Sequence, residues 1–155
     1  MIGIKENIST HFLHPSNLFA HKDRHMVTTI LGSCVAVCFY NTKYMYGGIN
    51  HYMLPLWNGD GLASPRYGNI AIEKLYGQMK EMGSLKDHLI AKVFGGANQI
   101  QGATNIGERN SVIATDMLKE LGVPIVAEST GGTVGRKIIF DTYTGMVKMK
   151  YVGSK

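Results

Sequence analysis

The chain has 155 residues, of which 45% are hydrophobic and 17% charged, and its formal net charge is +5 at pH 7. This length suits one domain with one core, so we expect residues 1–155 to form a single domain, with 1–25 as its less certain part. Lys and Arg form no basic stripe interleaved with aromatics, which argues against nucleic-acid binding. We expect a cytoplasmic protein without direct membrane insertion, because no apolar run approaches the roughly 20 residues of a membrane span and no secretory signal begins the chain.

The first 25 residues are polar and contain four of the six histidines: His11, His14, His21 and His25. A metal site needs three or four converging ligands, and no cysteine or carboxylate motif accompanies these histidines. We therefore expect surface histidines and no metal site.

Three apolar runs, each bounded by turn-forming residues, then predict consecutive strands over 26–30, 33–40 and 46–54. The loop 41–43 is typical of a hairpin between the second and the third. The two cysteines, Cys34 and Cys38, are four residues apart, about 13 Å along a strand, which is beyond disulfide reach. Both are expected to be free thiols.

The rest of the chain alternates helix and strand signals. Apolar residues at helical spacing predict amphipathic helices over 70–83 and 107–122. Further strands are predicted over 88–97, 124–130, 136–142 and 146–152, the last two as a hairpin. This order predicts an α/β sandwich in which the helices cover a mixed sheet.

Cys34 stands directly after Gly32 and Ser33, at the start of a predicted strand. A strand cysteine is more often core than catalyst, and this interpretation is preferred for Cys38. At Cys34 the glycine lets the backbone turn and leaves N–H groups free to stabilise an oxyanion, as a nucleophilic thiol requires. The N–H of Cys34 itself is the simplest such donor.

A thiol nucleophile also needs a base, and His51 is the only histidine in an apolar run. If the strands 33–40 and 46–54 form a hairpin in which paired residue numbers sum to about 85, Cys34 faces His51. A buried neutral histidine is the alternative interpretation. Thr28 and Thr29 alternate faces on the preceding strand, so one of them should orient the imidazole, and the pattern does not choose between them.

The segments TTILGSCVAVCFY, GGINHYMLP, KVFGGA, NIGERN and ESTGGTVGRKIIFDTYTG resemble, in order from about residue 26 to 152, the CheD family of chemoreceptor glutamine deamidases. The resemblance implies a thiol amidohydrolase without metal or cofactor that converts glutamine on chemoreceptor cytoplasmic helices to glutamate and releases ammonia. It implies Cys34 as the nucleophile, His51 as the base and Thr28, six positions before the cysteine, as the third residue. It also implies a three-layer sandwich of mixed sheets and two main helices, similar to deamidating toxins of the cytotoxic necrotizing factor type.

Around this centre, Gly32 and Ser33 are the expected oxyanion loop, and Gly95, Gly96 and Asn105 are candidates for the substrate-binding rim. For the last three a structural turn role fits equally well.

The resemblance further implies association with the CheC phosphatase where it is present, and a methylesterase side activity in some members. A competing hypothesis is a module that docks on receptors or on CheC with an idle cysteine; a depressed Cys34 pKa is expected only of the enzyme.

Overall fold

The computed structural model describes residues 8–98 and 105–153, within which it contains nine strands, two α-helices and one short 3-10 helix. In chain order these are β1 (Ser9–Phe12), β2 (Leu18–His21), β3 (His25–Leu31), β4 (Val35–Asn41), β5 (Tyr46–Asn50), α1 (Gly68–Glu81), η1 (Lys86–His88), β6 (Leu89–Gly95), α2 (Ile106–Leu121), β7 (Ile125–Thr130), β8 (Gly135–Asp141) and β9 (Val147–Val152). Part of the segment expected to be less certain, residues 1–7, lies outside the described residues. The predicted helices and strands are confirmed to within two residues at each end, except the strand over 46–54.

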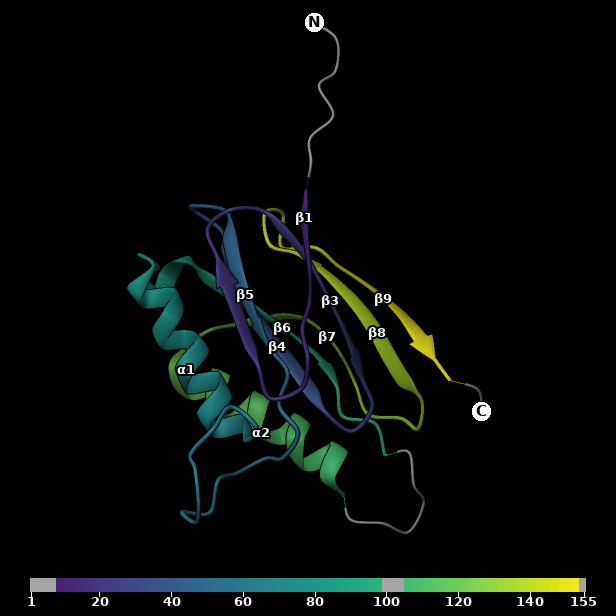
Figure 1. Cartoon of the computed structure of the whole chain (residues 1–155). Coiled ribbons are helices and arrows are strands. Elements are labelled where there is room, and N and C mark those ends of the chain that lie inside the picture. Colours follow the sequence, from purple (N-terminus) through teal and green to yellow (C-terminus); the bar gives the residue numbers. More distant parts are fainter. Residues whose placement is uncertain (1–7, 99–104, 154–155) are drawn as a thin grey trace, which may run out of the picture.

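Two mixed sheets and two helices form three layers. The four-stranded sheet has the order β1-β3-β8-β9, and the five-stranded sheet has the order β2-β5-β4-β6-β7. The pairs β1–β3 and β6–β7 are parallel, and the other neighbours are antiparallel. Figure 1 shows α1 and α2 on one side of the five-stranded sheet, with β8 and β9 of the other sheet on its opposite side. The expected mixed architecture with two main helices is confirmed.

The central strand β4 separates the two cores. Its seven residues are all buried, because the helices cover one face of the strand and the second sheet covers the other. Val35, Val37 and Phe39 pack in the core beneath the helices. Ala36 and Cys38 alternate with them and pack in the core between the sheets, which confirms the structural interpretation of Cys38.

Strands β1 and β2 lie in the segment for which no strand was predicted. Both are edge strands, and all four residues of β1 are exposed. Their formation depends on backbone pairing with β3 and β5 rather than on an apolar pattern, so the sequence gives no periodic signal for them. His11, His14 and His21 are exposed as expected, whereas His25 is half-buried.

The hairpin between β4 and β5 has a different register from the predicted one. Cys38 pairs with Ile49, so paired residue numbers sum to 87 rather than 85. The turn occupies 42–45 and is longer than predicted; the Asn41 side chain accepts backbone N–H groups inside it, and Met45 has a left-handed φ of 59°. A shift of two residues preserves the face on which each side chain lies, so the corrected register keeps Cys34 and His51 on the same face.

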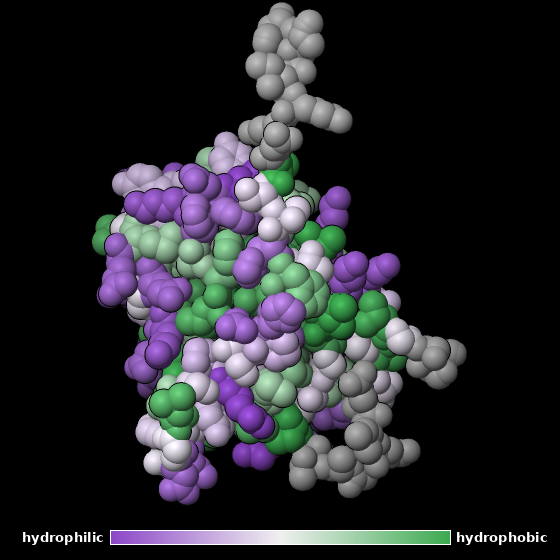
Figure 2. Space-filling view, in the orientation of Figure 1, coloured by the Kyte–Doolittle hydropathy of each residue, from purple (hydrophilic) through white to green (hydrophobic). Residues whose placement is uncertain are grey.

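Hydrophilic and hydrophobic side chains are interspersed over the face of the molecule shown in Figure 2. Within the described ranges, neither helix is long and apolar enough to span a bilayer.

Candidate active site

Cys34 lies in the short loop that carries the chain from β3 in one sheet to β4 in the other. Its thiol is free and half-buried, and it packs against the core between the sheets. Two backbone hydrogen bonds hold the loop: the N–H of Gly96 donates to the Cys34 carbonyl at 2.9 Å, and the N–H of Ala97 donates to the Gly32 carbonyl at 3.0 Å. The loop is therefore fixed to the end of β6, and Cys34 is held at the end of the sandwich.

His51 follows the last residue of β5 and is only 2% exposed. Tyr52, its neighbour, packs beneath the helices, so alternation directs the imidazole into the space between the sheets. The hydroxyl of Thr29, from the opposite sheet, donates to the Leu13 carbonyl at 2.7 Å and lies 2.7 Å from His51 Nδ1. Because a hydroxyl has one proton, Thr29 Oγ1 must accept the second bond from Nδ1–H.

This bond determines which imidazole nitrogen is available as a base. With the proton on Nδ1, the Nε2 atom of His51 has a free lone pair. Nε2 is buried and has no hydrogen-bond partner in the part of the chain that the structure describes. A buried acceptor without a partner is costly in a purely structural histidine, so Nε2 is available to take a proton from a thiol on the same face.

The resemblance implies Thr28 as the third residue, whereas in the structure the neighbouring Thr29 makes the hydrogen bond to His51. Successive side chains on β3 point to opposite faces, and Val27 and Leu31 pack between the sheets together with the fully buried Thr29. Thr28 therefore lies on the outer face of the four-stranded sheet, away from the imidazole.

Burial keeps both the Cys34 thiol and the His51 imidazole neutral in the site without substrate. It raises the pKa of the Cys34 thiol, an effect that the cysteine's own backbone N–H opposes only in part. Burial also lowers the pKa of His51 to about 4. The depressed thiol pKa expected of an enzyme is thus wrong for the site without substrate. At pH 7 this arrangement favours proton transfer from Cys34 to His51 during nucleophilic attack over a stable thiolate–imidazolium pair.

We expect iodoacetamide to alkylate Cys34 more slowly at pH 7 than it alkylates free cysteine, and the rate to keep rising above pH 9. The reason is that a raised thiol pKa lowers the thiolate fraction at any pH below it. The rate can be followed by mass spectrometry of the intact protein, with Cys34→Ser reporting any reaction at the buried Cys38. A fast reaction that is constant between pH 6 and 8 would contradict this expectation.

Two backbone donors near the thiol are open. In the described ranges, the N–H groups of Ser33 and Cys34 have no backbone acceptor, whereas that of Val35 donates to the Tyr52 carbonyl at 3.1 Å. Ser33 and Cys34 therefore stay the candidate oxyanion donors. The N–H of Gly96 is occupied by the Cys34 carbonyl, so in the structure Gly96 supports the loop, in line with the structural role that fitted it equally well.

Gly95 and Asn105 have different surroundings. A Cβ on Gly95 would lie 2.2 Å from the Cys34 carbonyl oxygen, so Gly95 also supports the loop backbone rather than offering a side-chain contact. Asn105 is exposed immediately before α2 and makes no side-chain cap. Its role at the rim stays a prediction.

Asn110 is a supporting residue that the sequence analysis missed. It is fully buried on α2, and its Nδ2 donates to the Ser33 carbonyl at 2.9 Å and to the Met53 carbonyl at 3.0 Å. One amide group thus joins the loop that holds Cys34 to the segment after His51. The available signal was an asparagine on the apolar face of a predicted amphipathic helix, where a buried amide needs partners.

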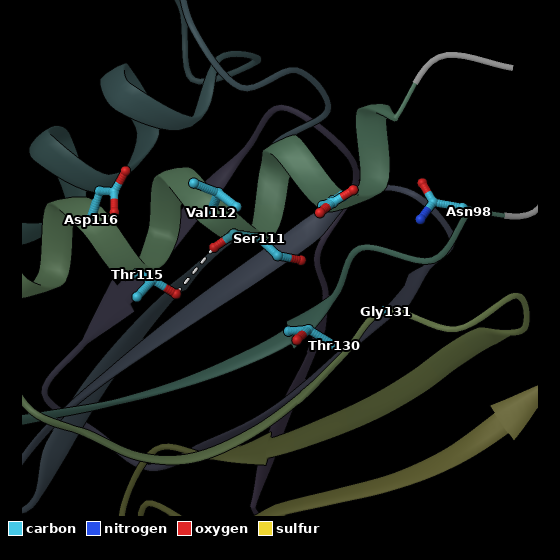
Figure 3. Close-up of a pocket in the computed structure, with 8 residues that line it drawn as sticks. Asn98, Ser111, Val112, Thr115, Asp116, Thr130 and Gly131 are labelled. Atoms are coloured by element: carbon cyan, nitrogen blue, oxygen red, sulfur yellow. Dashed lines mark hydrogen bonds between the residues drawn. The ribbon is translucent and has the colours of Figure 1, made fainter.

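A groove of about 480 Å³ lies between α2 and the end of β7. Figure 3 shows Ser111, Val112, Thr115 and Asp116 on the helix side and Thr130 and Gly131 on the strand side. Neither Cys34 nor His51 lines this groove, so it is distinct from the thiol site. No three His, Cys, Asp or Glu side chains in 8–98 and 105–153 are grouped so that they could hold a metal ion.

The comparisons with known proteins agree on one family. The sequence model described as CheD chemotactic sensory transduction matches residues 53–151. The probable chemoreceptor glutamine deamidase CheD of Trichlorobacter lovleyi is 50% identical over 143 residues, which cover 90% of this chain and 89% of the relative. The protein of the same description from Sulfurimonas denitrificans is 48% identical over 145 residues, covering 91% and 93% of the two chains. A third, from Shewanella oneidensis, is 38% identical and covers 89% and 70%.

Proposed function

Since this chain belongs to the CheD family, we propose that it is a chemoreceptor glutamine deamidase that uses Cys34 as its nucleophile. The observation that carries the mechanism is the hydrogen bond between Thr29 and Nδ1 of His51, which leaves Nε2 of the imidazole unpartnered on the same face as Cys34. The relatives' names state that those proteins deamidate glutamine of chemoreceptors. For this chain we place the target glutamine on a cytoplasmic helix of the receptor.

In the first half of the reaction, His51 Nε2 takes the Cys34 proton as the sulfur attacks the carboxamide carbon. The carbonyl oxygen becomes an anion that the N–H groups of Ser33 and Cys34 stabilise. When the tetrahedral intermediate collapses, the C–N bond breaks and the imidazolium returns its proton to the leaving nitrogen. Ammonia departs, and a thioester joins the substrate to Cys34.

In the second half, a water molecule attacks the thioester and gives a proton to His51 Nε2. The C–S bond then breaks, the sulfur of Cys34 recovers a proton, and the product is a glutamate side chain. Thr29 keeps the imidazole in the tautomer that serves as a base in both halves. The same route accounts for hydrolysis of glutamate methyl esters, with methanol as the leaving group.

We also propose a domain organisation, a partner and a fold relationship for this chain. Residues 1–155 act as one domain in the cytoplasm and associate with CheC where a cell has it. The layers of the fold are shared with deamidases of the cytotoxic necrotizing factor type; the support is that helices, five-stranded sheet and four-stranded sheet stack in three layers with the cysteine at one end.

The test is mass spectrometry of a chemoreceptor cytoplasmic fragment from the same cell after incubation with the protein under reducing conditions. We expect conversion of particular glutamines to glutamate by the wild type and none by Cys34→Ala. If no receptor of that cell is converted although the protein binds it, the docking module replaces the enzyme as the function.

A further inference from the structure

Arg136 is a buried cation for which the structure offers no anion. Its side chain is at the start of β8, and the residue is 3% exposed. Nε donates to the Ser129 hydroxyl at 3.0 Å, and Nη1 donates to the Gly95 carbonyl at 3.3 Å. Both acceptors are neutral, and no carboxylate in 8–98 or 105–153 forms an ion pair with Arg136. Removing a charge from water without a counter-ion is costly, so the arrangement needs a reason.

The guanidinium lies at the same end of the sandwich as the nucleophile. Ile138 and Phe140 of β8 pack between the sheets, so alternation directs Arg136 to this inner face too. Across the ladder, Arg136 pairs with Leu31, the last residue before the loop that carries Cys34. Its partner Gly95 packs against the loop that carries Cys34, where an added Cβ would overlap the Cys34 carbonyl oxygen.

The remaining amino group of Arg136 is open. Nη2 has no protein acceptor in the described part of the chain, and it is not among the fully buried polar atoms that lack one, so it retains a small contact with solvent within the 3% exposure of the residue. The ring of Tyr151, directly across the β8–β9 ladder, lies 5.3 Å from the guanidinium and is 60% exposed. The ring and the two neutral acceptors thus fix the guanidinium on the inner face of the four-stranded sheet, with Nη2 left without a protein partner.

Arg136 is not among the groups that shift the pKa of Cys34, which burial raises and the cysteine's own backbone N–H lowers in part. The remaining role for Arg136 is to bind a group of the substrate beside the Cys34 sulfur. A planar guanidinium held in this way suits a carboxylate, which accepts charge-assisted hydrogen bonds from it.

We propose that Arg136 forms a carboxylate-binding subsite beside the loop that carries Cys34, where it binds an acidic side chain near the target glutamine on the substrate helix. The identity of the substrate segment rests on the proposed function, whereas the subsite itself does not. Arg136 would thereby select glutamines that have an acidic neighbour, and its ion pair with substrate would supply the missing counter-ion.

The first experiment tests the subsite with small probes and needs no receptor. Cys34 is alkylated with iodoacetate, an anion, and with iodoacetamide, its neutral analogue, and the ratio of the two rates is measured at one pH. Arg136→Gln is expected to lower this ratio about threefold or more relative to wild type, because a nearby cation concentrates the anionic reagent. Arg136→Lys is expected to retain most of the ratio.

Lys137→Gln is the matched control, because it removes the same charge from the adjacent residue, which lines the outer side of the sheet. It is expected to leave the ratio nearly unchanged. Equal ratios in wild type, Arg136→Gln and Lys137→Gln, or equal decreases in both variants, would overturn the subsite. Thermal unfolding of each variant checks that the fold is retained, and Arg136→Lys decides the question if Arg136→Gln is unfolded.

The second experiment measures kcat/KM for receptor fragments in which acidic residues flanking the modified glutamine are changed to serine. We expect a loss of about tenfold with wild-type protein and almost none with Arg136→Gln. The same loss with both proteins would overturn the selection of acidic neighbours. If no receptor is deamidated at all, the proposed function fails, while the alkylation ratio still decides the subsite.

Discussion

Replacing His51 with alanine is expected to lower the deamidation rate constant by about two to four orders of magnitude, the range that a positioned general base contributes. The imidazole is the only group in our mechanism that takes the Cys34 proton and returns it to ammonia. Because burial raises the pKa of the thiol, the variant cannot rely on a thiolate already present at pH 7. Single-turnover kinetics on a receptor fragment at pH 7 would measure the loss, and a higher pH should restore part of the rate.

The threonine pair provides a matched control for this prediction. Thr29→Val keeps the shape of the side chain but removes the acceptor for Nδ1–H, so we expect a loss of about tenfold to a hundredfold. Thr28→Val removes a hydroxyl from the adjacent residue on the outer face and should change the rate less than about twofold. A larger loss with Thr28→Val than with Thr29→Val would contradict the assignment of Thr29.

Gly95→Ala is expected to destabilise the protein by at least about 3 kcal/mol. Gly95 has a left-handed φ of 116°, which side chains rarely adopt, and an added Cβ would lie 2.2 Å from the Cys34 carbonyl oxygen. The neighbouring atom is backbone, so relief requires movement of the loop that carries the nucleophile. Urea unfolding followed by circular dichroism would measure the loss in free energy of unfolding.

Gly132→Ala separates the cost of the left-handed backbone from the cost of contact with the Cys34 carbonyl. Gly132 also has a left-handed φ, of 74°, but an added Cβ would meet nothing within 4 Å. We expect only the backbone strain there, about 1 kcal/mol. Equal losses at Gly95 and Gly132 would mean that contact with the Cys34 carbonyl adds nothing to the cost.

Elements with local patterns could be predicted from the amino-acid sequence. The helices observed over 68–81 and 106–121 were predicted over 70–83 and 107–122, because apolar residues recur with the helical period. The strands from β6 to β9 were predicted because apolar runs end at turn-forming residues. The position of Cys34 after Gly32 and Ser33 was also readable, since a glycine before a strand is a local feature. The edge strands β1 and β2 were missed because backbone pairing, not an apolar pattern, forms them.

Which side chains meet depends on tertiary packing and could not be predicted. Thr29 and His51 belong to different sheets, so no spacing along the chain could identify their hydrogen bond or exclude Thr28. The face of each side chain followed from alternation within its own strand, but which faces oppose one another depends on how the two sheets stack. Asn110 and Arg136 were missed for the same reason: each acts on the site through partners far away in sequence. Local patterns indicated the candidate nucleophile and the candidate base, whereas the packing of the two sheets determines the tautomer of His51 and its neutral state.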